Sequence, residues 1–345
     1  LQYVFKDSLL KGTFTMRSSL MDLNQFMSSE DTTVAAGSAD TAAMSVIEVP
    51  SNIDFVLNST IRKLIYDDIE MSNVSGTVIV RNSKVIMQNL KMNTMGGGLM
   101  INSATYNTEN LKMPAVSFDM SATDFDIPMT VKYFNTVEKL APIAKYTTGR
   151  FSTQLKYSSS LDKAMMPDMK TLTGDGKLQT KQVVVAGFEP LNKLADALGG
   201  LDRFKQAEFS NLDISYHIKD GKVTTDEFPF KQNSVSGLAL GSTALDQTID
   251  YTMKMDIPTA DMPAKAKEFL TKQMAAASAL GANFKMPEKV KINALFGGTV
   301  MKPTLKTNYG DMKGNVKEAV TEQVKQVIEE KKEEVKQEIK KNIEE

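Results

Sequence analysis

The chain has 345 residues, with 41 Lys and Arg against 42 Asp and Glu, so its formal net charge is −1. This balance argues against a nucleic-acid-binding protein, because phosphate contacts require clustered basic charge. The sequence has no cysteine and a single histidine. Disulfides and thiolate metal sites are therefore excluded, and Ser-His-Asp triads and multi-histidine metal sites nearly so. The length suits one large elongated domain or two ordinary ones.

The N-terminal part alternates strand-like segments with one polar stretch. Residues 12–17 alternate in polarity, as a half-buried strand does. Residues 28–45 are mostly Ser, Ala, Thr, Asp and Gly, which predicts a loop. An apolar pattern returns at 50–58 and continues over 61–69.

The central feature of the sequence is a repeated unit of strand, turn, strand, glycine and strand. The first copy covers 71–108 and the second 209–246, with Met71 corresponding to Phe209 at a nearly constant offset. In the second copy Asp220-Gly221 separates two alternating segments, and Asp-Gly is a strong signal for a two-residue hairpin turn. Two copies of this unit predict a sheet that is extended by repetition.

The strands of the first copy are apolar on both faces, at 78–80 and at 85–87. Such strands are buried on both sides, by a helix or by a ligand. Alternating patterns predict further strands near 116–121, 149–157 and 290–306.

Helical spacing of apolar residues marks three internal segments: 131–145, which Pro142 interrupts, 190–205 and 262–280. The C-terminal segment 311–345 is rich in Lys and Glu and carries a thin apolar stripe, which predicts a long solvated helix. We therefore expect a β-sheet domain at 1–310 and a charged helix after it. This helix could pack along the domain, pair with a partner helix or act as a linker.

The sequence lacks an arrangement of residues that would support catalysis. His217 stands in the polar register of its strand, where a histidine is usually just exposed. The acidic residues have no calcium-loop spacing, and Gly96-Gly97-Gly98 lacks the GxGxxG spacing and following helix of a nucleotide site. We expect a binding or structural protein rather than an enzyme, with no cofactor and no metal.

The expected fold is mainly β with accessory helices, an elongated, curled antiparallel sheet. Its apolar face must be covered, either by the predicted helices or, in part, by a greasy ligand. From the residues alone these two possibilities stand near even. If the face stays open, the groove positions are the apolar register of the repeats. In the first copy both faces are apolar, so the choice of face is a hypothesis there. The candidates are Val78, Val80, Val85, Met87, Leu99, Ile101, Leu212, Ile214, Tyr216, Ile218, Tyr251, Met253 and Met255.

Four motifs in the second half point to a known family. They are LTGDGKL from Leu172, VVVAGFEPL from Val183, FSNL from Phe209 and LFGGTVMKP from Leu295. Together they resemble the C-terminal region of AsmA-like proteins, which group with TamB-like envelope proteins. The resemblance covers about 70–310 and leaves the charged tail outside it.

The resemblance implies a taco-like β-groove lined with apolar side chains that binds or conducts phospholipid acyl chains. It also implies a periplasmic body in a Gram-negative bacterium, an inner-membrane anchor upstream, and a role in outer-membrane biogenesis or phospholipid transport between the two membranes. This chain departs from the family's pattern in its charged tail, and a groove of this length is too short to span the envelope alone.

Two other functions compete with lipid binding. A scaffold for outer-membrane protein assembly would use an exposed sheet edge or the C-terminal helix to bind envelope proteins, and its sheet face would be fully covered. A hydrolase would need a polar cleft with clustered acids, which the sequence does not indicate.

Overall fold

The computed structural model describes residues 4–6, 9–27, 46–162, 165–198, 200–262 and 288–307, and single positions between 264 and 336. These residues form one sheet of sixteen strands. Fifteen strands follow each other as neighbours, and β10 pairs with β9 beside that path. The strands are β1 (Val4–Lys6), β2 (Leu9–Asp22), β3 (Ile53–Tyr66), β4 (Ile69–Arg81), β5 (Lys84–Thr94), β6 (Gly97–Asn107), β7 (Ala115–Asp126), β8 (Thr147–Ser160), β9 (Thr173–Ala186), β10 (Gln206–Ser210), β11 (Asp213–Lys219), β12 (Lys222–Gln232), β13 (Val235–Ala244), β14 (Ile249–Pro258), β15 (Lys289–Gly298) and β16 (Pro303–Thr307).

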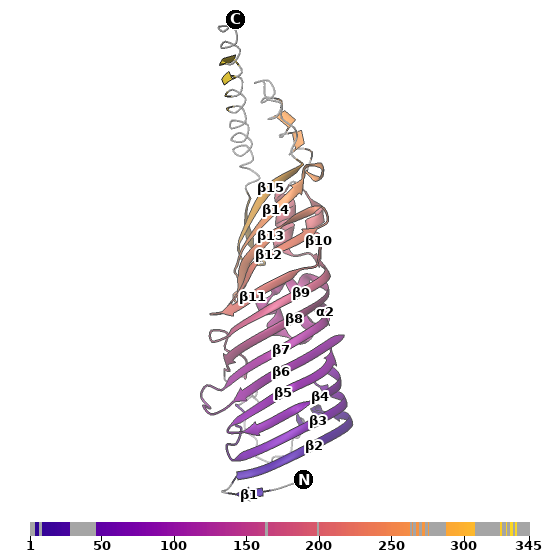
Figure 1. Ribbon diagram of the computed structural model, residues 1–345, viewed down its shortest axis with the longest axis vertical. Helices are drawn as coiled ribbons and strands as arrows, with labels where there is room; N and C mark the ends of the chain where they lie inside the picture. Colours follow the sequence, from indigo (N-terminus) through magenta and orange to yellow (C-terminus); the bar gives the residue numbers. More distant parts are fainter. Residues whose placement is uncertain are drawn as a thin grey trace, which may run out of the picture.

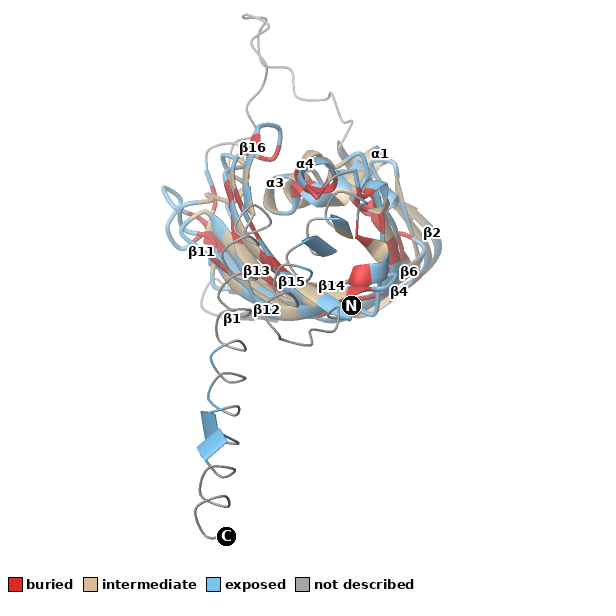
Figure 2. Ribbon diagram, turned by 90° about the horizontal axis from the view of Figure 1, so that it is seen from above, coloured by how far each residue is buried: buried red, intermediate tan, exposed pale blue. Residues whose placement is uncertain are grey.

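The strands follow one another along the long axis of the molecule (Figure 1). The sheet curls about this axis without closing (Figure 2). The expectation of a mainly β fold with a curled sheet is confirmed. The expectation that the sheet is wholly antiparallel is wrong, because β2 and β3 are parallel, from Leu10 beside Ile53 to Asp22 beside Ile65. A segment of thirty residues joins these two strands, which is long enough to return the chain to the same end of the sheet.

Tight turns join most neighbouring strands. The Asp220-Gly221 hairpin is confirmed, since Lys219 pairs with Lys222 and both turn residues have positive φ, 51° and 70°. Asn-Ser makes the equivalent turn of the first copy. The two copies differ at one strand: residues 69–81 form the single strand β4, in which Asn73 has φ 54°, whereas the second copy divides into β10 and β11 at the matching Asn211, which has φ 53°.

Short helices lie inside the curl (Figure 2). Between β7 and β8 are α2 (Ile127–Tyr133), α3 (Asn135–Leu140) and the 3₁₀ turn η1 (Pro142–Tyr146). The helix expected at 131–145 is thus three short pieces, and Pro142 begins the last. Between β9 and β10 are α4 (Glu189–Ala197) and η2 (Asp202–Phe204). The helix expected at 190–205 therefore ends early, just before Gly200, which has φ 88°.

Two short elements remain, α1 (Asn24–Met27) after β2 and the 3₁₀ turn η3 (Thr259–Asp261) after β14. The loop expected at 28–45 lies outside the described residues. So do most of the helix expected at 262–280 and most of the charged helix expected at 311–345.

Candidate functional site

One face of the sheet carries an apolar row that crosses twelve strands. Pairing between neighbouring strands places directly opposed residues on the same face. Followed through the sheet, the register aligns Phe14, Leu57, Val78, Met87, Ala104, Phe118, Tyr157, Gly174, Ile218, Val223, Thr243 and Ile249.

This row faces the inside of the curl. Its last member, Ile249, packs in one hydrophobic core with Leu194 and Leu198 around α4. Helix α4 lies within the mouth of the curled sheet (Figure 2). We call the face that carries this row the concave face.

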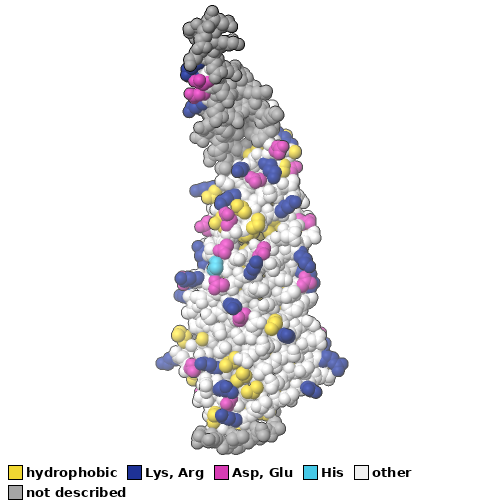
Figure 3. Space-filling view, viewed as in Figure 1, with side chains coloured by type: hydrophobic (Ala, Val, Ile, Leu, Met, Phe, Trp, Pro, Cys, Tyr) yellow, Lys and Arg dark blue, Asp and Glu magenta, His cyan; other side chains and the backbone are white. Residues whose placement is uncertain are grey.

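The neighbouring row, one residue along each strand, is polar throughout. It consists of Thr15, Asn58, Thr77, Gln88, Ser103, Asp119, Lys156, Asp175, His217, Thr224, Ser242 and Asp250. On this outer face Lys and Arg are interspersed with Asp and Glu (Figure 3). Successive side chains of a strand point to opposite faces, so an apolar row on the inner face has a polar row beside it on the outer face. This difference between the two rows is maintained across all twelve strands.

The thirteen candidate groove residues largely share the concave face. All except Leu212 belong to its rows, which the strand register connects from Val80 and Val85 at one end to Tyr251, Met253 and Met255 at the other. Leu212 lies between β10 and β11 and packs against the α4 core. In the first copy, therefore, the register places the chosen residues on the inner face and Ile79 and Ile86 on the outer one.

The two ends of the concave face differ in how they are covered. Near the C-terminus, Met255 is 1% exposed and Leu194 of α4 is 0% exposed, and both belong to the same core. Near the N-terminus, Val78, Val80 and Met87 are only half-buried. The α4 core therefore fills the C-terminal end of this face. Toward the N-terminus a smaller core is buried around Ile61, Val74 and Met92, while Val78, Val80 and Met87 remain partly accessible.

Sequence reasoning missed several members of the concave face. Phe118 stacks on Tyr157 across β7 and β8, with ring centroids 5.0 Å apart. Burial raises the pKa of the Tyr157 phenol to about 12. The alternation of Val116, Phe118 and Met120 with polar residues was the available signal, but only the register could show that these residues extend the same rows.

Two glycines of the concave face make room for tyrosine rings on the next strand. A Cβ at Gly176 would overlap the ring of Tyr216, and a Cβ at Gly241 would overlap the ring of Tyr251. The Tyr216 hydroxyl lies 3.2 Å from Thr153 Oγ1 on the same face. The tyrosines therefore lie along the sheet instead of projecting from it, with their hydroxyls partnered.

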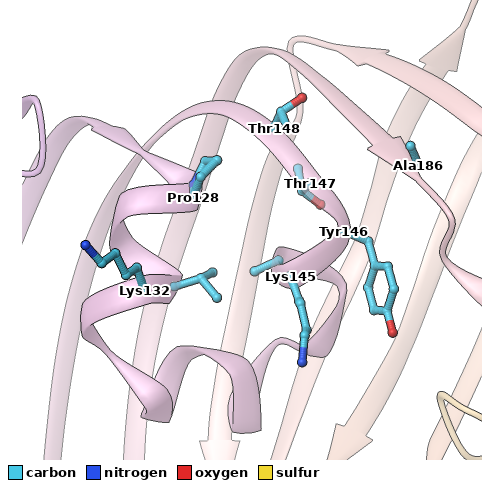
Figure 4. Close-up of a pocket in the computed structure, with 9 residues that line it drawn as sticks. Pro128, Lys132, Lys145, Tyr146, Thr147, Thr148 and Ala186 are labelled. Carbon is cyan, nitrogen blue, oxygen red and sulfur yellow. The ribbon is translucent and has the colours of Figure 1, made fainter.

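A pocket of about 530 Å³ lies beside the concave face, between α2, η1 and β8. Its lining includes Pro128, Lys132, Lys145 and Tyr146 (Figure 4). Lys145 and Tyr146 extend in one direction, while Lys132 points away from both. Since Lys145 Nζ is already 2.9 Å from Glu138, the two ammonium groups do not converge, and we assign this pocket no separate function.

His217 lies on the outer face between two carboxylates. Its Nδ1 is 2.6 Å from Asp175 and its Nε2 is 3.3 Å from Asp226. The hydrogen bond to Asp175 is the main cause that raises the pKa of His217. The triplet is exposed and away from the concave face. Within the described residues no group of three or more His, Asp or Glu side chains is arranged to hold a metal ion.

The fold and its inner face define a class: an open, curled β-sheet protein with an apolar inner face and an outer face that carries a continuous polar row. No protein family model, no curated protein and no solved structure matches the chain. Among the helices of the described residues, none has both the length and the apolar character needed to cross a bilayer.

Proposed function

We propose that this protein is a non-enzymatic lipid-binding protein that holds phospholipid acyl chains on the concave face between β3 and β8. The observation that carries the proposal is a set of half-buried apolar side chains, Leu57, Val78, Met87 and Phe118, which lie in one row of the inner face. Large apolar surfaces that remain accessible indicate a binding site, because water contact with them is unfavourable.

The size of this face supports an acyl chain as ligand. Strands are spaced about 4.8 Å apart, so β3 to β8 span about 24 Å along the stacking direction. One leaflet of a bilayer holds acyl chains in about 15 Å, half of its hydrocarbon thickness. The accessible part of the face thus accommodates the whole length of a chain.

The cellular role follows from the resemblance to AsmA-like proteins. We propose that the protein acts in the periplasm, tethered to the inner membrane through an upstream segment, and contributes phospholipid binding to outer-membrane biogenesis. The filled C-terminal end favours a protein that holds lipid along part of its length over one that conducts it from end to end. Met253 and Met255 then stabilise the fold, and the lipid contacts come from the first copy and its neighbours.

A pair of adjacent substitutions tests the lipid site. Met87→Asp puts a carboxylate on the concave face, and Ile86→Asp puts the same group on the outer face of the same strand, where Ile86 is also half-buried. Each variant is purified natively, its fold is checked by circular dichroism, and its bound lipid is measured by mass spectrometry after solvent extraction. We expect near-stoichiometric phospholipid in the wild-type protein and in Ile86→Asp, and loss of lipid in Met87→Asp.

Two results would contradict the proposal. One is a folded wild-type protein that carries no lipid, and the other is a folded Met87→Asp variant that retains it. Equal loss in both variants would show that the charge acts through the fold, and Val80→Asp against Ile79→Asp would then repeat the comparison on β4.

A second candidate function, a scaffold that binds other envelope proteins, rests on the edge of the sheet. Strand β2 pairs with β1 only over Leu9–Lys11, so within the described residues its outer edge from Gly12 to Asp22 has no strand partner. Such an edge can accept an extended segment of another protein. This function predicts a lipid-free wild-type protein and a partner whose binding is lost when Thr15→Pro removes a backbone donor from β2.

A further inference from the structure

Four exposed apolar side chains protrude from three connecting segments along one side of the sheet. They are Ile47 (67% exposed), which precedes β3, Leu111 (44%) and Met113 (58%), which follow β6, and Met166 (45%), which follows β8. We call these four residues the lip. Hydrophobic side chains gather at the left margin of the view in Figure 3, where Figure 1 places the turns after β6 and β8.

Hydrogen bonds hold the three segments together. The Tyr106 hydroxyl donates to the Ile47 carbonyl at 2.8 Å and lies 3.7 Å from Met165 Sδ. The backbone N–H of Val49 donates to Thr108 Oγ1 at 3.0 Å, and that of Leu161 donates to the Pro114 carbonyl at 2.7 Å. The protruding side chains therefore belong to one tied surface.

The lip is continuous with the concave face. Tyr106 belongs to the concave row in which Val80 opposes Val85, Val85 opposes Tyr106, and Tyr106 opposes Val116. An apolar path thus runs from the lip, past Tyr106, to the side chains of β4 and β5.

The charges of these segments are mixed. Asp162 accepts from the Met166 N–H and Asp168 from the Lys170 N–H, each at 3.0 Å, and Glu109 pairs with Lys84 at 3.2 Å. The lip therefore does not form a patch of one sign, and its attraction to a partner comes from its apolar side chains.

We propose that the lip inserts into the surface of a lipid bilayer and so places the concave face at the membrane. Separate apolar side chains that protrude from turns, methionine among them, suit fluid hydrocarbon, which requires no complementary shape. This inference rests on the proposed function, because the path past Tyr106 then carries an acyl chain between the bilayer and the concave face. Since the charges are mixed, binding to neutral vesicles is expected to persist at high salt.

The absence of tryptophan from the sequence allows a direct test. A tryptophan introduced as Met113→Trp or Met166→Trp reports its own environment, and Met301→Trp serves as the control. Met301 is 64% exposed and lies between β15 and β16, at the other end of the sheet. With phosphatidylcholine vesicles, we expect the emission of the two lip variants to shift to shorter wavelength and to be quenched by brominated lipid, while Met301→Trp is unchanged. Lip variants that respond no more than Met301→Trp would overturn the proposal, and a protein partner for the lip would then be sought.

A disruptive pair completes the test. In a sedimentation assay, we expect the double variant Met113→Asp/Met166→Asp to bind phosphatidylcholine vesicles with an affinity lower by at least about tenfold. It is expected to retain the lipid it carries from expression, and Met301→Asp should bind vesicles as the wild type does. Unchanged vesicle binding in the double variant would refute the lip. A wild-type protein that inserts its lip but carries no lipid would support the lip and contradict the lipid site, so the two failures are distinguishable.

Discussion

The packing of tyrosine over glycine on the concave face makes a quantitative prediction for Gly176→Ala. The added Cβ would overlap the Tyr216 ring, so the ring must move away from its position along the sheet. Overpacking of this kind costs about 1–3 kcal/mol. Displacement of the ring also breaks the contact of its hydroxyl with Thr153 Oγ1, at 3.2 Å, which contributes about 0.5–1.5 kcal/mol. Replacing glycine returns about 0.4–1 kcal/mol through the unfolded state, so we expect a net loss between about 0.5 and about 4 kcal/mol.

Gly98→Ala is the matched control, because a Cβ at this strand position meets no atom within 4 Å. It is expected to leave the free energy of unfolding unchanged or to raise it by about 0.4–1 kcal/mol. Equilibrium unfolding in urea, followed by circular dichroism, measures both variants. In a Tyr216→Leu background the cost of Gly176→Ala should fall. The reasoning is refuted if Gly176→Ala is as stable as Gly98→Ala while Tyr216 is present.

Two further variants test other parts of the molecule. The pKa of His217 is raised chiefly by its hydrogen bond to Asp175, so protonation of the imidazole stabilises the fold. That stabilisation is fully present below the unfolded pKa of about 6.5 and is lost as the pH rises through the higher folded value. NMR titration of this single histidine should give a pKa above about 6.5, which Asp175→Asn lowers; an unchanged midpoint would contradict the assignment. Leu194→Ala should destabilise the protein by about 2–5 kcal/mol, because Leu194 is 0% exposed in the α4 core, and calorimetry should show no comparable loss for the half-exposed Leu295→Ala.

The sequence predicted the elements that depend on local pattern. Alternation located the strands, and the Asp220-Gly221 pair located a hairpin, because a two-residue turn with positive φ is a property of those residues themselves. The parallel pairing of β2 and β3 could not be predicted, because an alternating pattern of apolar and polar residues reads the same whether the two strands run parallel or antiparallel. Nor could the break at Asn211, because the matching strand of the first copy continues through the same position.

The sequence did not predict which part of the concave face is covered and which part stays accessible. Met87 and Met255 both lie on the concave face and look alike in the alternating pattern. One is half-buried and the other is 1% exposed, because Met255 lies in the core that includes Leu194 of α4, a helix distant from both methionines in the sequence. Tertiary packing decides where a helix docks on a sheet. From the sequence alone, a face covered by helices and a face open to a ligand were therefore about equally favoured.

The order of the strands has a consequence for the length of the molecule. From β3 to β9, each strand pairs with the strands immediately before and after it in the chain. The addition or removal of one hairpin in this region changes the height of the sheet by about 10 Å and leaves the register of the remaining pairs intact. Height is thus an independent variable of this architecture, set by the number of hairpins, while the width of the sheet is set by strand length.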